Sequence, residues 1–139
     1  MAPRQPRALE VATRVLAKRD YSERGLRERL RRAGVDQGEE EQALRALRRA
    51  GVLDDARFAH SRAQALADRG QGDAAIRFDL RRQGVAEDEI EAALALLEPE
   101  RVRAQRVVAR RGSDAATARL LARRGFDEEV VEAAVAHEA

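Results

Sequence analysis

The sequence has 139 residues, which is within the usual size of one domain and leaves little room for separate enzymatic and regulatory modules. Its aromatic content is 3% and it has no Trp, so any core must be assembled from Leu, Val, Ile and Ala and will be thin. The 27 basic and 25 acidic residues give a formal net charge of +2, which argues against an indiscriminate polycation, and the lack of cysteine excludes disulfide scaffolds, thiolate metal sites and thiol catalysis.

Three helices are predicted in a first unit, residues 1–51. The leading helix spans about residues 8–19. The middle helix carries Leu26 and Leu30 on one face, and it ends at Gly34, where a residue able to adopt positive φ is favoured. A third helical pattern follows the glycine, with apolar residues at Ala43, Leu44 and Leu47. The unit therefore consists of two helices, a glycine turn and a further helix.

The same order of features recurs in a second unit, residues 52–98, and in a third, residues 99–139. Their leading helices are expected over residues 55–68 and 100–111. The glycine that ends the middle helix recurs at spacings of fifty and forty-one residues, as Gly34, Gly84 and Gly125. The unequal spacing indicates related units and not a strict solenoid. The sequence predicts an all-α fold of about nine helices, built as three tandem three-helix, helix-turn-helix-like repeats in an elongated, curved array.

Residues able to cap a helix precede the middle helices. Ser22 and Ser113 are predicted to be the N-caps of the first and third middle helices, because a serine hydroxyl accepts a hydrogen bond from a free backbone N–H of the first turn. Gly72, or Asp73 beside it, is a weaker start for the second. Tyr21 is spaced to pack on the first turn as a hydrophobic staple, which fixes the angle at which the chain enters the helix.

The residues needed for catalytic or metal-binding chemistry are not gathered in this sequence. His60 and His137 are the two histidines, and they are far apart with no nearby ligand cluster. The glycines in residues 69–72 lack the Lys-Ser or Lys-Thr of a phosphate-binding loop. No signal peptide is recognisable, and no apolar run approaches about 18 residues. We expect a soluble, cytoplasmic protein that binds another macromolecule, without enzymatic activity, cofactor or metal.

Helix, turn and helix is also the outline of a DNA-reading motif, so major-groove recognition by the third helix of each unit is the main alternative. The first turns of these helices are acidic. They contain Glu39, Glu40, Glu41, Glu87, Asp88, Glu89, Asp127, Glu128 and Glu129. Acidic residues stabilise a helix start through the helix dipole, but they repel a DNA backbone. Base-specific reading by these helices is therefore not expected.

Arginine supplies nearly all the positive charge, and it groups on particular helix faces. With Leu26 and Leu30 turned inward, a rotation of about 100° per residue places three arginines together on the outward side of the first middle helix. The predicted partner-binding set is Arg24, Arg27, Arg31, Arg77, Arg81, Arg103, Arg106, Arg110, Arg119, Arg123 and Arg124. Residues 100–124 hold eight arginines against two acids, whereas residues 53–99 hold six against ten. This segregation favours a long partner surface, with a solvated, salt-bridged surface as the alternative for each stripe.

A charged and apolar run, Leu53, Asp54, Asp55, Arg57 and Phe58, lies where the first two units join. One of the two aspartates is predicted to cap the helix that follows, and Phe58 to enter the core between the units. Direct contact of this run with a partner is the alternative.

Residues 51–59 have the sequence Gly-Val-Leu-Asp-Asp-Ala-Arg-Phe-Ala. Together with Tyr21, Ser22 and the Arg-Gly-Gln-Gly of residues 69–72, this stretch resembles the RecX family of bacterial recombinase regulators. The resemblance covers nearly the whole chain and is loosest in the third unit. The sequence departs from the family pattern in three places. The family usually has an aromatic residue at the position of Val52, and often Tyr-Gly-Pro at the positions of Gln71-Gly72-Asp73. It usually has a Glu-Leu pair where this sequence has Asp79-Leu80.

The resemblance implies a modulator of the RecA recombinase that binds in the helical groove of the RecA filament on single-stranded DNA. Such proteins suppress ATP hydrolysis and strand exchange, and they block filament extension or promote disassembly. The arginines would then meet acidic groups of the filament or DNA phosphates. A general DNA-binding protein and a helical scaffold for another partner remain alternatives. We expect a monomer, because no unusually apolar outer face stands out.

Overall fold

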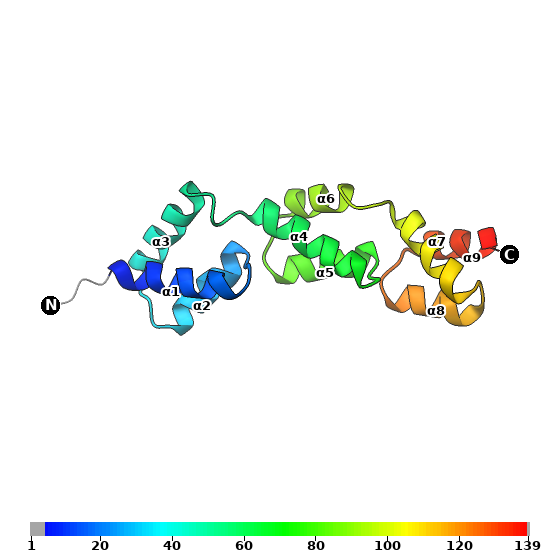
Figure 1. Cartoon of the computed structure of the whole chain (residues 1–139), viewed down its shortest axis with the longest axis horizontal. Coiled ribbons are helices and arrows are strands. Elements are labelled where there is room, and N and C mark those ends of the chain that lie inside the picture. Colours follow the sequence, from blue (N-terminus) through cyan, green and yellow to red (C-terminus); the bar gives the residue numbers. More distant parts are fainter. Residues whose placement is uncertain (1–4, 139) are drawn as a thin grey trace.

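The computed structural model describes residues 5–138, and the side chains of residues 7–136. Within this range the chain forms nine α-helices and no strand. They are α1 (Gln5–Lys18), α2 (Glu23–Arg32), α3 (Gln37–Arg49), α4 (Asp55–Asp68), α5 (Asp73–Arg82), α6 (Glu87–Ala95), α7 (Glu100–Arg111), α8 (Ala115–Arg123) and α9 (Glu128–Glu138). Figure 1 shows them as three groups of three in one elongated row. The predicted all-α repeat fold is confirmed.

Each group of three helices encloses its own small apolar core. The helix pairs that pack extensively all lie within α1 to α3, α4 to α6, or α7 to α9. The large buried side chains of the three cores are Leu26, Leu30 and Leu44, then Ile76, Leu80 and Ile90, then Val108, Leu121 and Phe126. Leu53 packs in the first core, although the predicted boundary placed it in the second unit. The chain thus has three thin cores in a row, as expected from its aliphatic composition.

The glycine after each middle helix closes the turn as predicted. Gly34, Gly84 and Gly125 have φ angles of 81°, 81° and 88°, a region that side chains rarely adopt. In the first unit Val35 N–H donates to the Leu30 carbonyl (3.1 Å), and the same bond recurs in the other two units at 3.1 Å. This is the Schellman pattern, which satisfies a carbonyl that the helix leaves free. Each third helix therefore leaves its middle helix at a fixed angle.

The starts of the middle helices differ among the units. Ser22 caps α2 as predicted, with its Oγ accepting from the backbone N–H three residues on (3.1 Å). The prediction for Ser113 is wrong, because Asp114 caps α8 and accepts from Thr117 N–H (2.9 Å). A carboxylate at this position also interacts favourably with the helix dipole, which a hydroxyl does only weakly. Gly72 begins α5 without a side-chain bond, so this helix start depends on contacts from elsewhere.

The first and second units are joined through the ends of their middle helices. Ser22 Oγ donates to the Gln83 carbonyl at the end of α5 (2.6 Å). Asp55 Oδ1, at the start of α4, accepts from Glu23 N–H at the start of α2 (2.8 Å). The positive N-terminus of α2 thereby meets the negative C-terminus of α5, a favourable arrangement of helix dipoles. Asp55 therefore caps a helix of the preceding unit and not its own.

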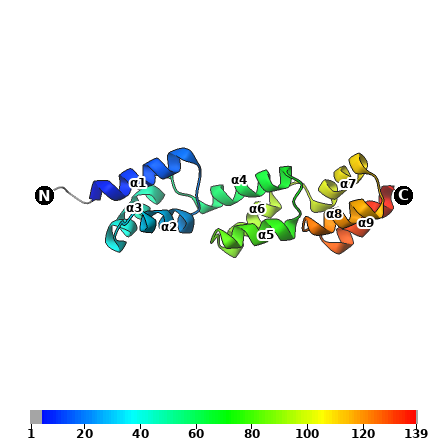
Figure 2. The same cartoon turned by 90° about the horizontal axis from the view of Figure 1, so that it is seen from below.

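The second and third units meet in the same way. Gly72 N–H donates to the Arg124 carbonyl at the end of α8 (2.8 Å). Glu100 Oε2, at the start of α7, accepts from Asp73 N–H at the start of α5 (2.6 Å). The three middle helices α2, α5 and α8 consequently follow one another along the row (Figure 2). Hydrogen bonds to backbone groups hold both junctions.

The C-terminal turn of α2 offers the same acceptors, but no unit of the described chain precedes it. Arg7 of α1 takes this place: its guanidinium donates to the Ala33 carbonyl (2.5 Å) and to the Gly34 carbonyl (3.4 Å). Ala33 is the C-cap of α2, as Gln83 and Arg124 are the C-caps of α5 and α8. A side chain of the first unit therefore occupies the position that a neighbouring unit fills at the other two sites.

Acidic side chains gather at the first junction. Glu89 of α6 has a carboxylate oxygen that is buried without a hydrogen-bond partner among the described residues. Burial raises the pKa of Glu89, and the negative charges of Asp55, Asp88 and other neighbouring carboxylates raise it further. Burial also raises the pKa of Asp55, against the opposing effect of its bond to Glu23 N–H. The ionised forms of both groups therefore destabilise the folded chain.

We expect Glu89→Gln to increase the free energy of unfolding at pH 7. Because the pKa of Glu89 is higher in the folded than in the unfolded chain, the cost of ionisation is fully present above the folded pKa and vanishes below the ordinary glutamate pKa of about 4.3. Urea unfolding followed by circular dichroism at pH 7.5 and pH 4 would measure this difference. Glu132→Gln, on the exposed side of α9, is the control and should change stability at neither pH. Equal stability of Glu89→Gln and the unmodified chain at pH 7.5 would contradict the expectation.

Candidate partner-binding surface

The three arginines predicted on the first middle helix are all paired with carboxylates of the same unit. Arg27 hydrogen-bonds to the Glu41 carboxylate, and its guanidinium lies 3.6 Å from the carboxylates of Glu23 and Glu40. Its side chain is only 21% exposed. The bond to Glu41 raises the pKa of Arg27 despite the opposing effect of burial. Arg31 Nε donates to Glu40 at 3.1 Å.

Glu40 accounts for part of this pairing. It is 1% exposed although it lies in the first turns of α3, and it stands where the other units have Ile90 and Val131. A buried carboxylate needs a cation beside it, and the two arginines of α2 supply the positive charge. Arg24 lies 3.9 Å from the Glu28 carboxylate, and its guanidinium also binds the Arg82 carbonyl at the end of α5. All three arginines of this stripe therefore have partners inside the chain.

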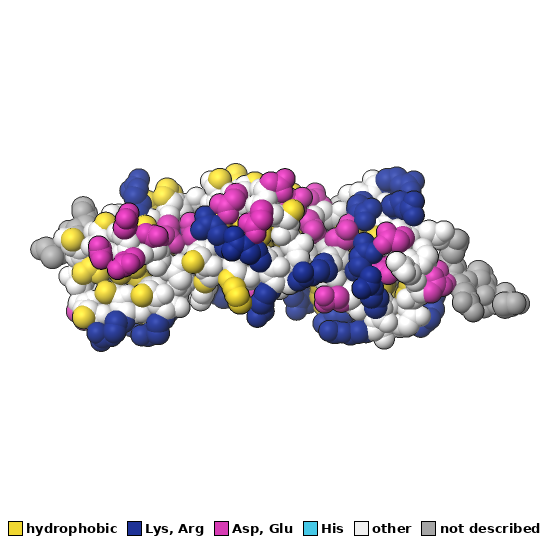
Figure 3. Space-filling view, turned by 180° about the vertical axis from the view of Figure 1, so that it is seen from behind, with side chains coloured by type: hydrophobic (Ala, Val, Ile, Leu, Met, Phe, Trp, Pro, Cys, Tyr) yellow, Lys and Arg dark blue, Asp and Glu magenta, His cyan; other side chains and the backbone are white. Residues whose placement is uncertain are grey.

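The two predicted arginines of α5 are also paired. Arg77 contacts Glu91 through two hydrogen bonds of 2.8 and 3.0 Å. Arg81 contacts Glu87 through two hydrogen bonds of 2.5 and 3.1 Å. These bonds raise the pKa of both guanidinium groups and lower that of both carboxyl groups. Figure 3 shows acidic and basic side chains interspersed over the middle of this face, which is opposite the row of leading helices. The pairs tie α5 to α6 and leave little net charge there.

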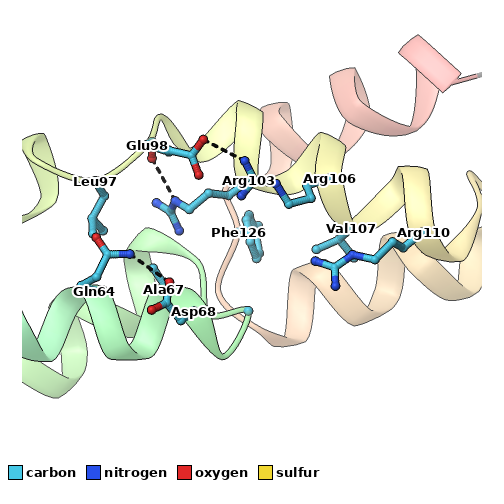
Figure 4. Close-up of a pocket in the computed structure, with 11 residues that line it drawn as sticks. Gln64, Ala67, Asp68, Leu97, Glu98, Arg103, Arg106, Val107, Arg110 and Phe126 are labelled. Atoms are coloured by element: carbon cyan, nitrogen blue, oxygen red, sulfur yellow. Dashed lines mark hydrogen bonds and ion pairs between the residues drawn. The ribbon is translucent and has the colours of Figure 1, made fainter.

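In the third unit, Arg103 is structural. It is 7% exposed, and its guanidinium donates to the Glu98 carbonyl (3.0 Å), as Figure 4 shows. It also donates to the Gln71 carbonyl (3.0 Å) and pairs with the Asp73 carboxylate. Its burial removes Arg103 from the predicted partner surface, because the side chain connects α7 to the start of α5. Arg106 forms an exposed ion pair with Glu98 at 2.8 Å. Four predicted arginines form no ion pair with a described carboxylate: Arg110, Arg119, Arg123 and Arg124.

A further set of cations lies at or beside the C-terminal ends of the leading helices. Figure 2 shows that α1, α4 and α7 follow one another along the same side of the molecule. We name this set the leading-helix track, and it consists of Arg14, Lys18, Arg19, Arg29, Arg69, Arg110, Arg111 and Arg124. None of these side chains forms an ion pair with a described residue. The track therefore carries positive charge that the chain itself does not neutralise.

The track is continuous because neighbouring surface hollows share residues. The cations lining the three hollows are Arg14, Lys18 and Arg29 in the first, Arg19, Arg62 and Arg69 in the second, and Arg69, Arg110, Arg111 and Arg124 in the third. Arg69 lines two of them. Arg19 and Arg29 both lie over the ring of Tyr21, at 4.8 and 5.4 Å from its centroid, and so connect the first hollow to the second. One basic surface thus runs over parts of all three units.

Two acids line these hollows, and each already accepts a hydrogen bond. Asp20 accepts from Tyr21 N–H (3.1 Å). Asp68 accepts from the Gln64 side-chain amide (2.9 Å), as Figure 4 shows. The eight cations of the track therefore outnumber its neighbouring acids by a wide margin.

The prediction missed most of this set because it grouped arginines around the faces of single helices. The signal is present in the repeat. Arg19 and Arg69 directly follow the last residues of α1 and α4, fifty residues apart, and Arg111 is the last residue of α7. Arg14 and Lys18 of the first unit likewise correspond to Arg106 and Arg110 of the third. The arginines near the ends of the leading helices could have been found from this recurrence, whereas Arg29 and Arg124 belong to the track only through the packing of the helices.

The run at the first junction has the structural role that was expected, with two changes. Asp54 is the aspartate that caps α4, since it accepts from Arg57 N–H (3.1 Å). Arg57 donates in turn to the carbonyls of Gly51 and Val52 (2.9 and 2.8 Å). Phe58 packs in the core of the second unit, and not in a core between the units, because each unit has a closed apolar cluster of its own.

The described residues contain neither a metal-binding cluster nor a membrane-spanning helix. His60 is exposed on α4, whereas His137 lies outside the residues whose side chains are described. Among the described residues, no group of three or more His, Cys, Asp and Glu could hold a metal ion. No described helix has the length and apolar character needed to cross a membrane.

Comparison with known proteins shows a similarity to RecX proteins over part of the chain. Residues 54–94 match the RecX second three-helix domain. A regulatory protein RecX from Syntrophotalea carbinolica is 47% identical over 66 residues, which are 48% of this chain and 42% of the relative. The chain is therefore similar to RecX proteins over part of its length, which includes the second unit. A regulatory protein RecX from Acidithiobacillus ferrooxidans is 50% identical over 48 residues, 34% of this chain and 32% of the relative. The matched part thus spans less than half the length of these RecX proteins.

Solved RecX structures share the fold over all three units. RecX from Lactobacillus salivarius superposes with a TM-score of 0.83 over 99% of this chain and 97% of that chain, at 15% identity. A second crystal structure, of a regulatory protein RecX, superposes with a TM-score of 0.79 over 94% of this chain and 72% of that chain, at 22% identity. The three-unit arrangement is therefore the fold of these RecX structures.

Proposed function

We propose that this chain regulates a RecA recombinase by binding the RecA filament on single-stranded DNA in its helical groove. The observation that carries the proposal is the match of α4 to α6 to the RecX domain, since relatives that share this segment are named regulatory protein RecX. Bound there, the chain suppresses ATP hydrolysis, strand exchange and filament growth. The RecA protein is the main partner, and DNA within the filament is a second contact.

The shape and stiffness of the chain support this proposal. Three units are held end to end by bonds such as Ser22 to Gln83 and Gly72 to Arg124, so a long surface exists before any partner is bound. A partner that repeats along its axis can use such a surface without first ordering it, which lowers the cost of association. The chain acts in the cytoplasm as a monomer, and it acts by binding and not by catalysis.

Base-specific DNA recognition is less well supported. The third helices α3, α6 and α9 would have to approach phosphates with their first turns, and each of these turns contains acidic residues. In α6, Glu87 is already paired with Arg81. Repulsion from a DNA backbone disfavours insertion of these helices into a groove.

The proposal is tested by titrating the purified chain into RecA, single-stranded DNA and ATP. We expect ATP hydrolysis to be suppressed at substoichiometric or near-stoichiometric amounts, because each bound chain acts on several contiguous filament subunits. Electron microscopy of the same mixtures should show shorter or fewer filaments. A parallel titration without RecA checks that the assay enzymes are unaffected.

Hydrolysis that stays unchanged at a molar excess of the chain would contradict the proposed function. Binding to single-stranded DNA together with an unaffected RecA would instead favour a general DNA-binding role.

A further inference from the structure

We propose that the leading-helix track binds the phosphodiester backbone of single-stranded DNA. This inference rests on the proposed function, because that function places the strand within a recombinase filament. Binding of the strand itself depends only on the charge and shape of this surface. It assigns the DNA contact to the side of α1, α4 and α7, whereas five of the predicted arginines lie on α2 and α5.

Charge is the first support for this assignment. The arginines of α2 and α5 are bonded to carboxylates or carbonyls of the chain, so a phosphate would have to compete with these partners. The track cations form no such pairs with described residues, and each phosphate that they contact releases a condensed counterion. A polyanion therefore gains more from the track than from the paired face.

The repeated position of three arginines is the second support. Arg19, Arg69 and Arg111 lie at the ends of successive leading helices and are all exposed. A strand that runs along the row therefore meets an exposed arginine near the end of the leading helix in each unit. Phosphates recur regularly along a nucleic acid, so a regular row of single cations matches a backbone better than it matches a folded acidic protein.

The hollow between the second and third units supplies a site of suitable size. It has a volume of about 300 Å³ and is lined by Arg69, Arg110, Arg111 and Arg124, with Asp68 as its one acid. The Arg124 guanidinium lies against Gly70, where an added Cβ would come within 2.8 Å of its Nη1. The missing side chain at Gly70 thus lets Arg124 reach this hollow, where four arginines line the site proposed for a phosphate.

The first unit adds an aromatic group to the track. Tyr21 is the one tyrosine of the sequence, and its ring lies against the guanidinium groups of Arg19 and Arg29. Aromatic rings beside cations are the usual platform for unpaired bases, because every base has a stacking face. Tyr21 is partly buried against the first core, so a base that stacks on its ring takes the place of one of the two guanidinium groups.

The orientation of the helices also favours a single strand over a duplex. The helices α1, α4 and α7 lie lengthwise along the row, as Figure 2 shows, so none of them projects end-on into a major groove. Recognition is consequently independent of sequence, and the affinity depends strongly on salt.

Fluorescence anisotropy of a labelled oligothymidylate with the full chain tests the proposal. The track variant replaces Arg19, Arg69 and Arg111 by Gln. The matched control replaces Arg32, Arg82 and Arg123, which lie at equivalent places at the ends of α2, α5 and α8 and are also exposed. Both variants remove three charges from helix C-termini, so net charge and helix-dipole effects are the same. Circular dichroism should show both to be folded.

We expect the track variant to bind at least about tenfold more weakly and to reduce the slope of log affinity against log salt by about two, since a single strand loses about 0.7 per phosphate contact. The control should bind within about twofold of the unmodified chain. Equal weakening by both variants, or no binding by the unmodified chain, would overturn the assignment.

The RecA ATPase assay separates this proposal from the function on which it rests. If the track variant loses inhibition but binds oligothymidylate normally, the track contacts RecA and the assignment to DNA is wrong. If the unmodified chain binds DNA through the track but leaves RecA unaffected, the surface stands and the proposed function fails.

Discussion

Replacing Gly72 by Ala should loosen the third unit from the second and lower the free energy of unfolding by about 3 kcal/mol. An added Cβ would lie 2.5 Å from both the carbonyl carbon and the oxygen of Gly125, and closer still to Phe126 N. All three are backbone atoms, so no change of rotamer can relieve the overlap. The bond from Gly72 N–H to the Arg124 carbonyl would be lost as the junction opens.

Hydrogen exchange measured by mass spectrometry locates this effect. Amides at the end of α8 and the start of α5 should exchange faster in Gly72→Ala, while those of the first unit keep their protection. Gly38→Ala is the control, because its Cβ would meet only Asp36 Oδ1, at an ordinary 3.4 Å, and alanine favours a helix over glycine. Unchanged exchange at the second junction in Gly72→Ala would show that the chain accommodates the methyl group.

Arg103→Ala should be nearly as damaging, with a loss of about 3 kcal/mol in the free energy of unfolding. The guanidinium satisfies two carbonyls, those of Glu98 and Gln71, and neutralises Asp73 at the start of α5. It also lies over the ring of Phe126, 5.9 Å from the centroid. Its removal leaves a partly buried carboxylate and two acceptors without partners, and such unsatisfied groups dominate the cost.

The matched control is Arg101→Ala, two residues earlier on α7, where the side chain is exposed and forms no ion pair with a described residue. Its stability should stay within about 0.5 kcal/mol of the unmodified chain. Urea unfolding followed by circular dichroism compares the two. Similar losses for both variants would mean that the bonds of Arg103 contribute little and that the deletion of an arginine from this helix is what matters.

Secondary structure and repeat organisation were predictable because they depend on local rules. Leu26, Leu30 and Gly34 specify a helix face and its end within nine residues, and the equivalent triplets of the other units do the same. The N-cap of α8 was missed by one position because Ser113 and Asp114 are both good caps. Sequence alone does not reveal which of two adjacent caps the preceding loop will place.

The candidate surface was harder to predict, because it depends on distances between helices. A rotation about one helix axis places Arg27 and Arg31 on an outward side, but it does not show that Glu40 and Glu41 of α3 lie within reach. Arg103 was assigned to an exposed stripe for the same reason, although the second unit covers it. Pairing across helices decides which charges remain for a partner, and helical periodicity does not reveal it.

The guanidinium of Arg7 gives the row a closed end. If the carbonyls of Ala33 and Gly34 were unoccupied, the start of a middle helix from another copy could dock on them, as α2 docks on α5 within the chain. A second copy could dock there only by displacing Arg7 from these two carbonyls, so this side chain raises the cost of end-to-end association.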